Sequence, residues 1–266
     1  MSIRLPIYPA AVPHLARINV TPVKGTALHH LPSARLDERG IGGNRRFHLA
    51  DDRGRLFSGL GHGPLVRVVC EVDDGLLTCR FPDGTVASAV TDDLGALEEI
   101  DFEGRAVPGR PVGGDLSAAF SAYVGAQVRL FRTERDGDGP DEMPLTVVSF
   151  ASVDELARRG NHDGPLDPLR FRINLELDGL EPFEEDTWDG MRVRIGEAIV
   201  RIAGQIPRCA VTAQDPTTGL HDWSTLKQIA AFRPLTADRE VPFGVYATVE
   251  QPGPVAVGDT VGPLGP

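Results

Sequence analysis

Cys209 is the residue of this sequence whose surroundings best suit chemistry. It lies in the stretch QIPRCAVTAQDPTTG, at the end of an apolar run, directly after Arg208 and before a polar turn broken by proline. A neighbouring cation favours the ionised form of a thiol, and a thiolate is the ligand that soft or redox-active metals prefer. The sequence therefore makes Cys209 a candidate nucleophile or metal ligand.

Isolated basic residues stand at the ends of several predicted strands. They are Lys24, Arg45, Arg46, Arg170, Arg172 and Arg208. Asn174 follows Arg172 by two positions, which would place both side chains on one face of a strand. Taken singly, each basic residue is typical of a surface charge. Taken together, they could form a cradle for a polyanion, with the Cys209 thiolate at its floor.

The composition narrows the class of protein. The 266 residues carry 38 acidic and 27 basic side chains, a net charge of −11, which argues against a general nucleic-acid surface. The sequence has no run of about 20 apolar residues and no signal-peptide pattern, so we expect a cytoplasmic protein without a membrane span. Three cysteines without metal-type spacing argue against a disulfide framework, and we expect Cys70 and Cys79 to be core residues on a hairpin.

Familiar catalytic motifs are absent from the sequence. It contains no H-E-x-x-H, no C-x-x-C and no G-x-S-x-G, which argues against a metal cage built by protein alone and against a hydrolase nucleophile elbow. The segment GLGHG at 59–63 is rich in glycine but lacks the spacing of a phosphate loop and a helix after it. We therefore expect a turn there.

The residues that could do chemistry are distributed over many short predicted strands. Turn dipeptides between β-branched runs predict strands that include 47–51 and 171–177. Short helices are predicted at 115–125, at 152–159, where Ser152 would open a capping box, and in the sequence STLKQIAAF. These patterns predict a mostly β protein with a few short helices and curled, barrel-like sheets.

Three segments closely resemble the MOSC domain, the domain found at the C-terminus of molybdenum-cofactor sulfurases. They are LRFRINLELDGLEPFEEDTW, IPRCAVTAQDPTTG and FGVYATVEQPGPVAVGDTV, which carry the motifs F-R-x-N, E-D-x-W, R-C and D-P-x-T-G in family order. Upstream, RINVTPVKG and GNRRFHLAD resemble the β-barrel domain that precedes MOSC in the branch with the mitochondrial amidoxime-reducing components. The resemblance covers about residues 14–262. It implies a β-rich N-terminal domain at 1–134, a linker or loop at 135–144 and a barrel-like MOSC domain at 145–266.

The resemblance also implies a cofactor and its contacts. In the family, the cysteine of the R-C motif binds the molybdenum of a pyranopterin (molybdopterin) cofactor, a role that falls to Cys209. The contacts to the anionic pterin carry over to Lys24, Arg46, Arg172, Asn174 and Arg208. A serine before the first helix of the domain contributes as well; Ser152 is the nearest match, and Ser149 is the alternative. Arginine suits such a role because it binds phosphate through charge-assisted, often bidentate hydrogen bonds.

The activity that the resemblance implies is a molybdenum-dependent oxidoreductase acting on N-oxygenated small molecules such as amidoximes or hydroxylamines. An iron–sulfur cluster needs about four protein ligands, and only two cysteines remain besides Cys209. We therefore expect a separate electron donor, which would be a ferredoxin, a flavoprotein or a haem protein. The alternatives are a protein that transfers sulfur as a persulfide on Cys209 or carries the cofactor, and a binding module that has lost the cofactor.

Overall fold

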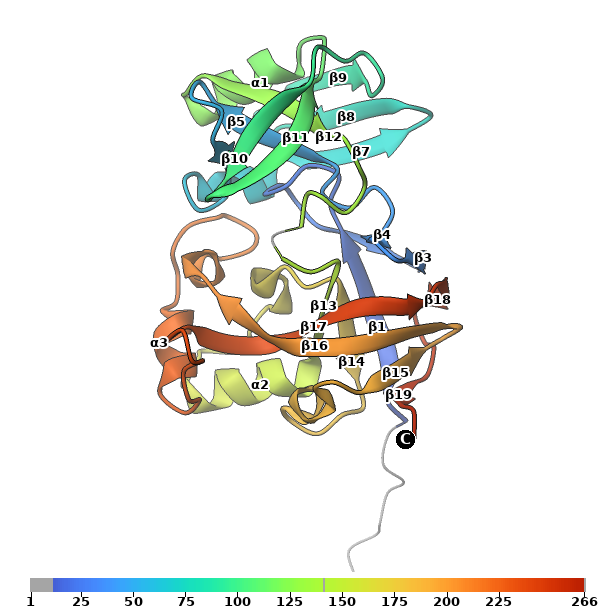
Figure 1. The fold of residues 1–266 in the computed structure, drawn as a ribbon. Helices are drawn as coiled ribbons and strands as arrows, with labels where there is room; N and C mark the ends of the chain where they lie inside the picture. The colour runs from blue at the N-terminus through green and yellow to red at the C-terminus, as the bar shows by residue number, and fades with distance from the viewer. Residues whose placement is uncertain (1–11, 141, 266) are drawn as a thin grey trace, which may run out of the picture.

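Strands make up most of the ordered secondary structure, together with three short α-helices. The computed structural model describes residues 12–140 and 142–265. Figure 1 shows two bodies stacked one above the other, with α1 and β7–β12 in the upper body and α2, α3 (Thr225–Ala230) and β13–β17 in the lower one. The prediction of a mostly β fold with a few short helices is confirmed. Most of the N-terminal stretch in which we expected no signal peptide lies outside the described residues.

The lower body is built on an eight-stranded sheet in the order β19-β15-β16-β17-β13-β14-β1-β2. Its strands are β1 (His14–Val20), β2 (His29–Leu31), β13 (Leu145–Ser149), β14 (Leu175–Asp178), β15 (Arg192–Ile195), β16 (Ala198–Arg208), β17 (Val241–Gln251) and β19 (Val261–Pro263). β13 and β14 run parallel, whereas the other neighbours are antiparallel. β1 pairs with β14, and β2 pairs with β1, so both strands belong to the sheet of the C-terminal half. They do so although they come before residue 134, where we expected the N-terminal domain to end.

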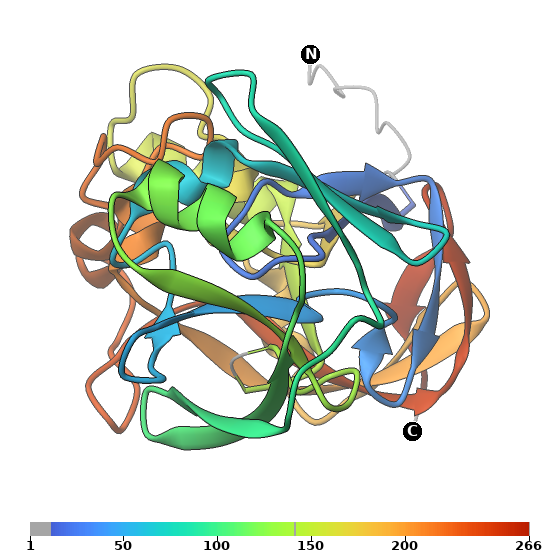
Figure 2. The same ribbon diagram turned by 90° about the horizontal axis from the view of Figure 1, so that it is seen from above.

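The upper body contains a five-stranded sheet, β10-β11-β12-β5-β6, and a three-stranded sheet, β7-β8-β9. The elements are β5 (Phe47–Asp51), β6 (Leu56–Phe57), η1 (Gly63–Arg67), β7 (Val69–Asp73), β8 (Leu76–Arg80), β9 (Val86–Val90), β10 (Glu98–Phe102), β11 (Arg105–Pro111), α1 (Leu116–Val124) and β12 (Val128–Thr133). A third small sheet joins β18 (Gly253–Ala256), β3 (Ser33–Asp37) and β4 (Gly40–Ile41). Seen from above, α1 lies across the top of the upper body (Figure 2).

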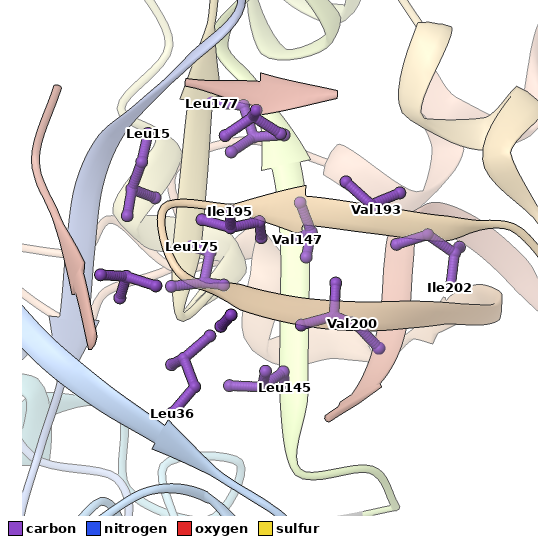
Figure 3. Close-up of a cluster of buried hydrophobic side chains, with 14 of the residues drawn as sticks. Leu15, Leu36, Leu145, Val147, Leu175, Leu177, Val193, Ile195, Val200 and Ile202 are labelled. Atoms are coloured by element: carbon purple, nitrogen blue, oxygen red, sulfur yellow. The ribbon is translucent and has the colours of Figure 1, made fainter. Parts of the chain in front are cut away.

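Each body has its own apolar core. In the lower body, alternate residues of neighbouring strands point to one face of the sheet, and Figure 3 shows Leu145, Val147, Leu175 and Leu177 meeting there. The opposite face of the sheet packs against α2 (Phe150–Arg159), which buries Leu156 among other apolar side chains. The upper body has a separate core under α1, built around side chains such as Leu49, Leu77 and Phe120. The residues that lie between the two bodies are therefore positioned by two separate cores.

The end of α1 is where the sequence predicts it, whereas the start of α2 differs from the prediction. Gly125 ends α1 with a left-handed φ of 69°, as the sequence indicated. The capping box expected at Ser152 is wrong, because Ser149 is the N-cap of α2 and its Oγ accepts a hydrogen bond from the backbone N–H of Ser152. Glu155 pairs instead with the arginines at the end of the helix. None of the helices among the described residues is long and apolar enough to cross a membrane.

A buried carboxylate lies on the helix-covered face of the large sheet. Leu175 and Leu177 of β14 point into the core, so Glu176 points to the opposite face, where it is fully buried. Arg17 Nη1, on the adjacent strand, lies 3.1 Å from Glu176 Oε2. Burial raises the pKa of Glu176 from its ordinary value of 4.5 to about 7, and Arg17 only partly opposes this shift. The neutral form of Glu176 is therefore favoured by the fold.

Replacing Glu176 by glutamine tests the cost of this burial. Near pH 4 the carboxyl group is protonated in both states, so Glu176→Gln and the unchanged protein should be equally stable. As pH rises from 4.5 through about 7, the unchanged protein loses the stability that the protonated form provides. We expect Glu176→Gln to be more stable at pH 8 by up to about 3 kcal/mol in urea unfolding. A variant less stable at pH 8 would mean that the ion pair with Arg17 outweighs burial.

Candidate functional site

A cavity of about 340 Å³ lies between the two bodies, and both contribute to its wall. Five of the residues predicted to form the site line it, namely Lys24, Arg172, Asn174, Arg208 and Cys209. Arg45, Arg170 and Tyr246 line it as well. The structure thus brings together side chains that are far apart in the sequence; Lys24 and Cys209, for example, are 185 positions apart. This convergence makes the cavity the candidate functional site.

Cys209 presents its thiol at this cavity. The residue follows the last position of β16 and is the N-cap of the short helix η4 (Ala210–Ala213). Its carbonyl oxygen accepts hydrogen bonds from the backbone N–H and the hydroxyl of Thr212, which fix the backbone. Unlike the two buried cysteines, Cys209 is an exposed, free thiol. The fold therefore holds the backbone of Cys209 while leaving its sulfur available to a ligand.

The guanidinium of Arg208 is buried beside this thiol and is incompletely paired. Its Nε donates to the carbonyl oxygen of Phe243 at 2.7 Å, and Nη1 donates to that of Phe171 at 3.1 Å. Its Nη2 is buried and has no hydrogen-bond acceptor among the described residues. Burial lowers the pKa of Arg208 to about 10, which leaves it charged at neutral pH. A buried, charged donor without an acceptor is costly unless a ligand supplies the acceptor.

Arg172 and Arg45 have unusual backbone conformations, and the side chain of Arg45 bonds the backbone of Arg172. Both have left-handed φ values, 52° and 53°, and such a conformation costs a non-glycine residue about 1–2 kcal/mol. Arg172 Nη2 donates to the carbonyl oxygen of Thr26 at 2.7 Å, and Arg45 Nη2 donates to that of Arg172 at 3.1 Å. Strained residues of this kind are concentrated at ligand-binding sites.

The strand predicted at 171–177 begins later than expected. The short helix η2 (Pro168–Phe171) comes first, Arg172 caps it, and β14 starts at Leu175. The argument that Arg172 and Asn174 share one strand face is therefore wrong, although both line the cavity. The helix is favoured because Asp167 accepts a hydrogen bond from the backbone of Leu169 and Pro168 opens the turn.

Lys24 and Asn174 are tied to the surrounding protein. Lys24 Nζ donates to the carbonyl oxygen of Gly139 at 3.0 Å, so it anchors the segment between the two halves of the chain. Asn174 Nδ2 donates to the carbonyl oxygen of Asn19 at 3.2 Å, and its Oδ1 accepts from Thr146 Oγ1 at 3.0 Å. Asn174 therefore connects β1, β13 and β14 at the base of the cavity, which suits a positioning role.

The structure places three of the predicted site residues elsewhere. Arg46 lines a second groove and pairs with Asp136. Ser149 and Ser152 are buried at the start of α2, where the Ser149 hydroxyl donates to Glu185 at 2.9 Å and that of Ser152 accepts from the backbone of Phe183. None of the three is among the residues that line the cavity.

Arg45, Arg170 and Tyr246 are among the cavity residues that the family motifs did not single out. Arg45 and Arg170 belong to the basic residues that the sequence itself marked at the predicted strand ends. Arg170 forms an ion pair with Asp222 at 2.9 Å and donates a hydrogen bond to the carbonyl oxygen of Thr212. Tyr246 lies on β17 and had no distinguishing signal, because it is one aromatic residue within an apolar strand.

Two loops from different bodies contact each other, and one of them, at 58–60, lines the cavity. The segment at 58–62 is a turn that leads into η1, as predicted for GLGHG. Gln214 Nε2 donates to the carbonyl oxygen of Gly59 at 2.9 Å. Gly63 and Gly219 approach so closely that a Cβ on Gly219 would lie 2.1 Å from the carbonyl oxygen of Gly63. Glycine is therefore required at this contact between the bodies.

The chain is similar in sequence to several known proteins. The family model described as MOSC domain matches residues 134–262. Mitochondrial amidoxime reducing component 2 of Rattus norvegicus is 30% identical over 248 residues, which cover 82% of this chain and 72% of the relative. The Homo sapiens protein of the same name is 26% identical over 281 residues, 93% of this chain and 82% of the relative. Molybdenum cofactor sulfurase of Drosophila grimshawi is 24% identical over 250 residues, 88% of this chain but 32% of that protein.

The close contact at Gly219 yields a prediction with a matched control. Gly219 and Gly190 have nearly the same left-handed φ, 73° and 72°, but no atom lies near a Cβ built on Gly190. Gly190→Ala should therefore cost only about 1 kcal/mol of unfolding free energy, for its backbone conformation. Gly219→Ala should cost about 1–3 kcal/mol more, because it also clashes with Gly63. Equal losses in chemical denaturation would contradict the contact.

Proposed function

Because the chain belongs to the MOSC-domain family, we propose that it is a molybdenum-cofactor-dependent oxidoreductase that reduces N-oxygenated, and in particular N-hydroxylated, small molecules. The names of its amidoxime-reducing relatives support this activity. The observation that carries the proposal is the pairing of an exposed thiol, Cys209, with the buried and unsatisfied Nη2 of Arg208 in one cavity.

The residues of the cavity fit a molybdenum pyranopterin. Its terminal phosphate would supply the acceptor that Arg208 Nη2 lacks, through a charge-assisted hydrogen bond. Lys24, Arg45 and Arg172 add positive charge around the same cavity. Cys209 offers a thiolate, the kind of ligand suited to a soft metal. The cavity volume of about 340 Å³ lies within the range of about 300–1,000 Å³ typical of small-molecule sites.

The protein supplies binding and orientation in this proposal. When bound, the cofactor provides the redox chemistry by which an oxygen atom is removed from the substrate. Arg208 and Arg172 would hold the phosphate end, while Cys209 would hold the metal end at the tip of β16. The loops around Gly59 and Gln214 would limit the access of water on their side of the cavity.

The electrons would come from a separate protein. Apart from Cys209, the chain has two cysteines, Cys70 and Cys79, and both are buried on a hairpin of the upper body. An iron–sulfur cluster needs about four ligands of this kind. We therefore propose a ferredoxin, a flavoprotein or a haem protein as the donor, and a small molecule as the substrate.

A second candidate function is sulfur transfer or cofactor delivery. It is favoured by the exposure of the Cys209 thiol, which could carry a persulfide, and by the similarity to a protein named molybdenum cofactor sulfurase. Under this reading Cys209 would bear a labile sulfur atom, and the cavity would hold the pterin without turnover. Cyanide releases persulfide sulfur, so the two functions differ in a measurable product.

Purification from a host that makes the cofactor tests the proposed function. We expect near-stoichiometric molybdenum in the unchanged protein, reduction of an amidoxime with reduced viologen as donor, and loss of that activity in Cys209→Ser. The substituted protein should remain folded, because the side chain is exposed. A protein that lacks molybdenum but carries cyanide-labile sulfur on Cys209 would refute the oxidoreductase and support sulfur transfer.

Arg208→Gln tests the anion site separately from the metal ligand. Losing a charge-assisted hydrogen bond worth about 1.5–3 kcal/mol should lower the affinity for the pterin about tenfold to a hundredfold. Arg201→Gln is the matched control, because Arg201 lies on the same strand but is half exposed and pairs with Glu250. Pterin content, measured by fluorescence after oxidative release, should fall only in Arg208→Gln. Equal pterin content in both variants would contradict the assignment.

A further inference from the structure

Cys70 and Cys79 face each other across two antiparallel strands of the upper body. Cys70 lies on β7 and Cys79 on β8, and the two are direct partners in the register of the hairpin. Both side chains are fully buried, and both are free thiols. Their sulfur atoms lie 2.7 Å apart, with the Cys79 thiol donating toward the Cys70 sulfur. This distance approaches the length of a disulfide bond, about 2.05 Å.

The turn of the hairpin fixes the kind of pair that they form. Asp74 and Gly75 both have positive φ values, 44° and 75°, as a two-residue type I′ turn requires. The pair next to such a turn, Asp73 with Leu76, exchanges hydrogen bonds, and the two kinds of pair then alternate along the ladder. Three steps from the turn, Cys70 and Cys79 therefore form a non-hydrogen-bonded pair.

Non-hydrogen-bonded pairs bring side chains closest together. Their Cα atoms are about 4.5 Å apart, which lies within the range of about 4.4–6.8 Å that a disulfide can span. A covalent bond between Cys70 and Cys79 would therefore require little movement of the backbone. The hairpin is also short, so the two thiols remain neighbours whenever β7 and β8 are paired.

We propose that Cys70 and Cys79 form a redox-active dithiol that exchanges with small-molecule disulfides such as oxidised glutathione. One cysteine thiolate attacks a sulfur of the small disulfide, forming a mixed disulfide and expelling one small thiolate. The second cysteine then attacks the protein sulfur, forming the Cys70–Cys79 bond and expelling the other. The two protein thiols are oxidised, the small disulfide is reduced to two thiols, and the two protons pass to the expelled thiolates.

The surroundings of the pair set its access and its rate. Cys70 borders the second groove together with His29 and Arg46, but its side chain is fully buried, so exchange requires local opening of the groove wall. Burial and the adjacent Cys79 thiol raise the pKa of Cys70, and the thiolate is the reacting species. Exchange should therefore be slow near neutral pH and faster in alkaline solution.

The pair is connected through Thr26 to Arg172, which lines the cavity between the bodies. Cys70 interacts with the side chain of Thr26, whose carbonyl oxygen accepts the hydrogen bond from Arg172. The proposed disulfide does not depend on the proposed oxidoreductase function, because it involves neither the cofactor nor Cys209.

Peptide mapping of the full-length protein tests this proposal. The reduced protein is incubated with oxidised glutathione near neutral pH and at about pH 9, and is then alkylated in denaturant and digested with trypsin. Cleavage after Arg67 and Arg80 releases residues 68–80 as one peptide that contains both cysteines. We expect this peptide to appear unalkylated and two hydrogen atoms lighter than the dithiol, and to form faster at the higher pH.

The exposed Cys209 provides an internal control in protein produced without the cofactor, where no metal holds its sulfur and it should take up glutathione in the same sample. In Cys79→Ala, Cys70 has no partner and should be recovered alkylated or bound to glutathione. The proposal is overturned if residues 68–80 of the unchanged protein remain doubly alkylated, or carry glutathione, in samples where Cys209 has reacted. The main result comes from the unchanged protein, so it stands even if the variant folds poorly.

Discussion

The organising feature of this structure is a buried positive charge that the protein leaves incompletely paired. Arg208 lies at the end of β16 and lines the cavity, and two backbone carbonyl oxygens of the lower body accept from its Nε and Nη1. Its Nη2 is left without an acceptor among the described residues. Taking a guanidinium out of water costs several kcal/mol unless anions or acceptors replace the water. This unpaired donor lies in the residue next to Cys209. An anionic ligand bound at Arg208 and Cys209 would supply the missing acceptor.

The rest of the structure keeps this site rigid. The loop between β1 and β2 contains Lys24 and Thr26, and both strands belong to the sheet of the lower body. The carbonyl oxygen of Thr26 accepts a hydrogen bond from Arg172, and Lys24 donates one to Gly139 in the linker. Each body has a core of its own, so the wall of the cavity is fixed from both sides. The strained conformation of Arg172 survives because these contacts surround it. The site is therefore a product of the packing between the bodies.

The sequence predicts the chemistry of this site better than its geometry. Five of the predicted residues line the cavity, because short motifs place a cysteine and basic residues beside turns. Arg46 was preferred to Arg45 through the family motif, but the left-handed φ of Arg45 turns the neighbouring side chains toward different cavities. The alternation of residues in a sequence does not predict a single left-handed residue of this kind. The resemblance implies a cofactor contact from Ser152 or Ser149, but in the structure both serines lie at the start of α2, where Ser149 is the N-cap and accepts from the backbone of Ser152.

The central claim is that Arg208 and Cys209 hold the two ends of one molybdenum pyranopterin. A crystal structure of the protein purified with its cofactor tests this claim most directly. The account predicts a phosphate oxygen within hydrogen-bonding distance of Arg208 Nη2, and the Cys209 sulfur bonded to the metal in the same cavity. A cofactor whose phosphate lies away from Arg208, or whose metal has no bond to Cys209, would contradict it.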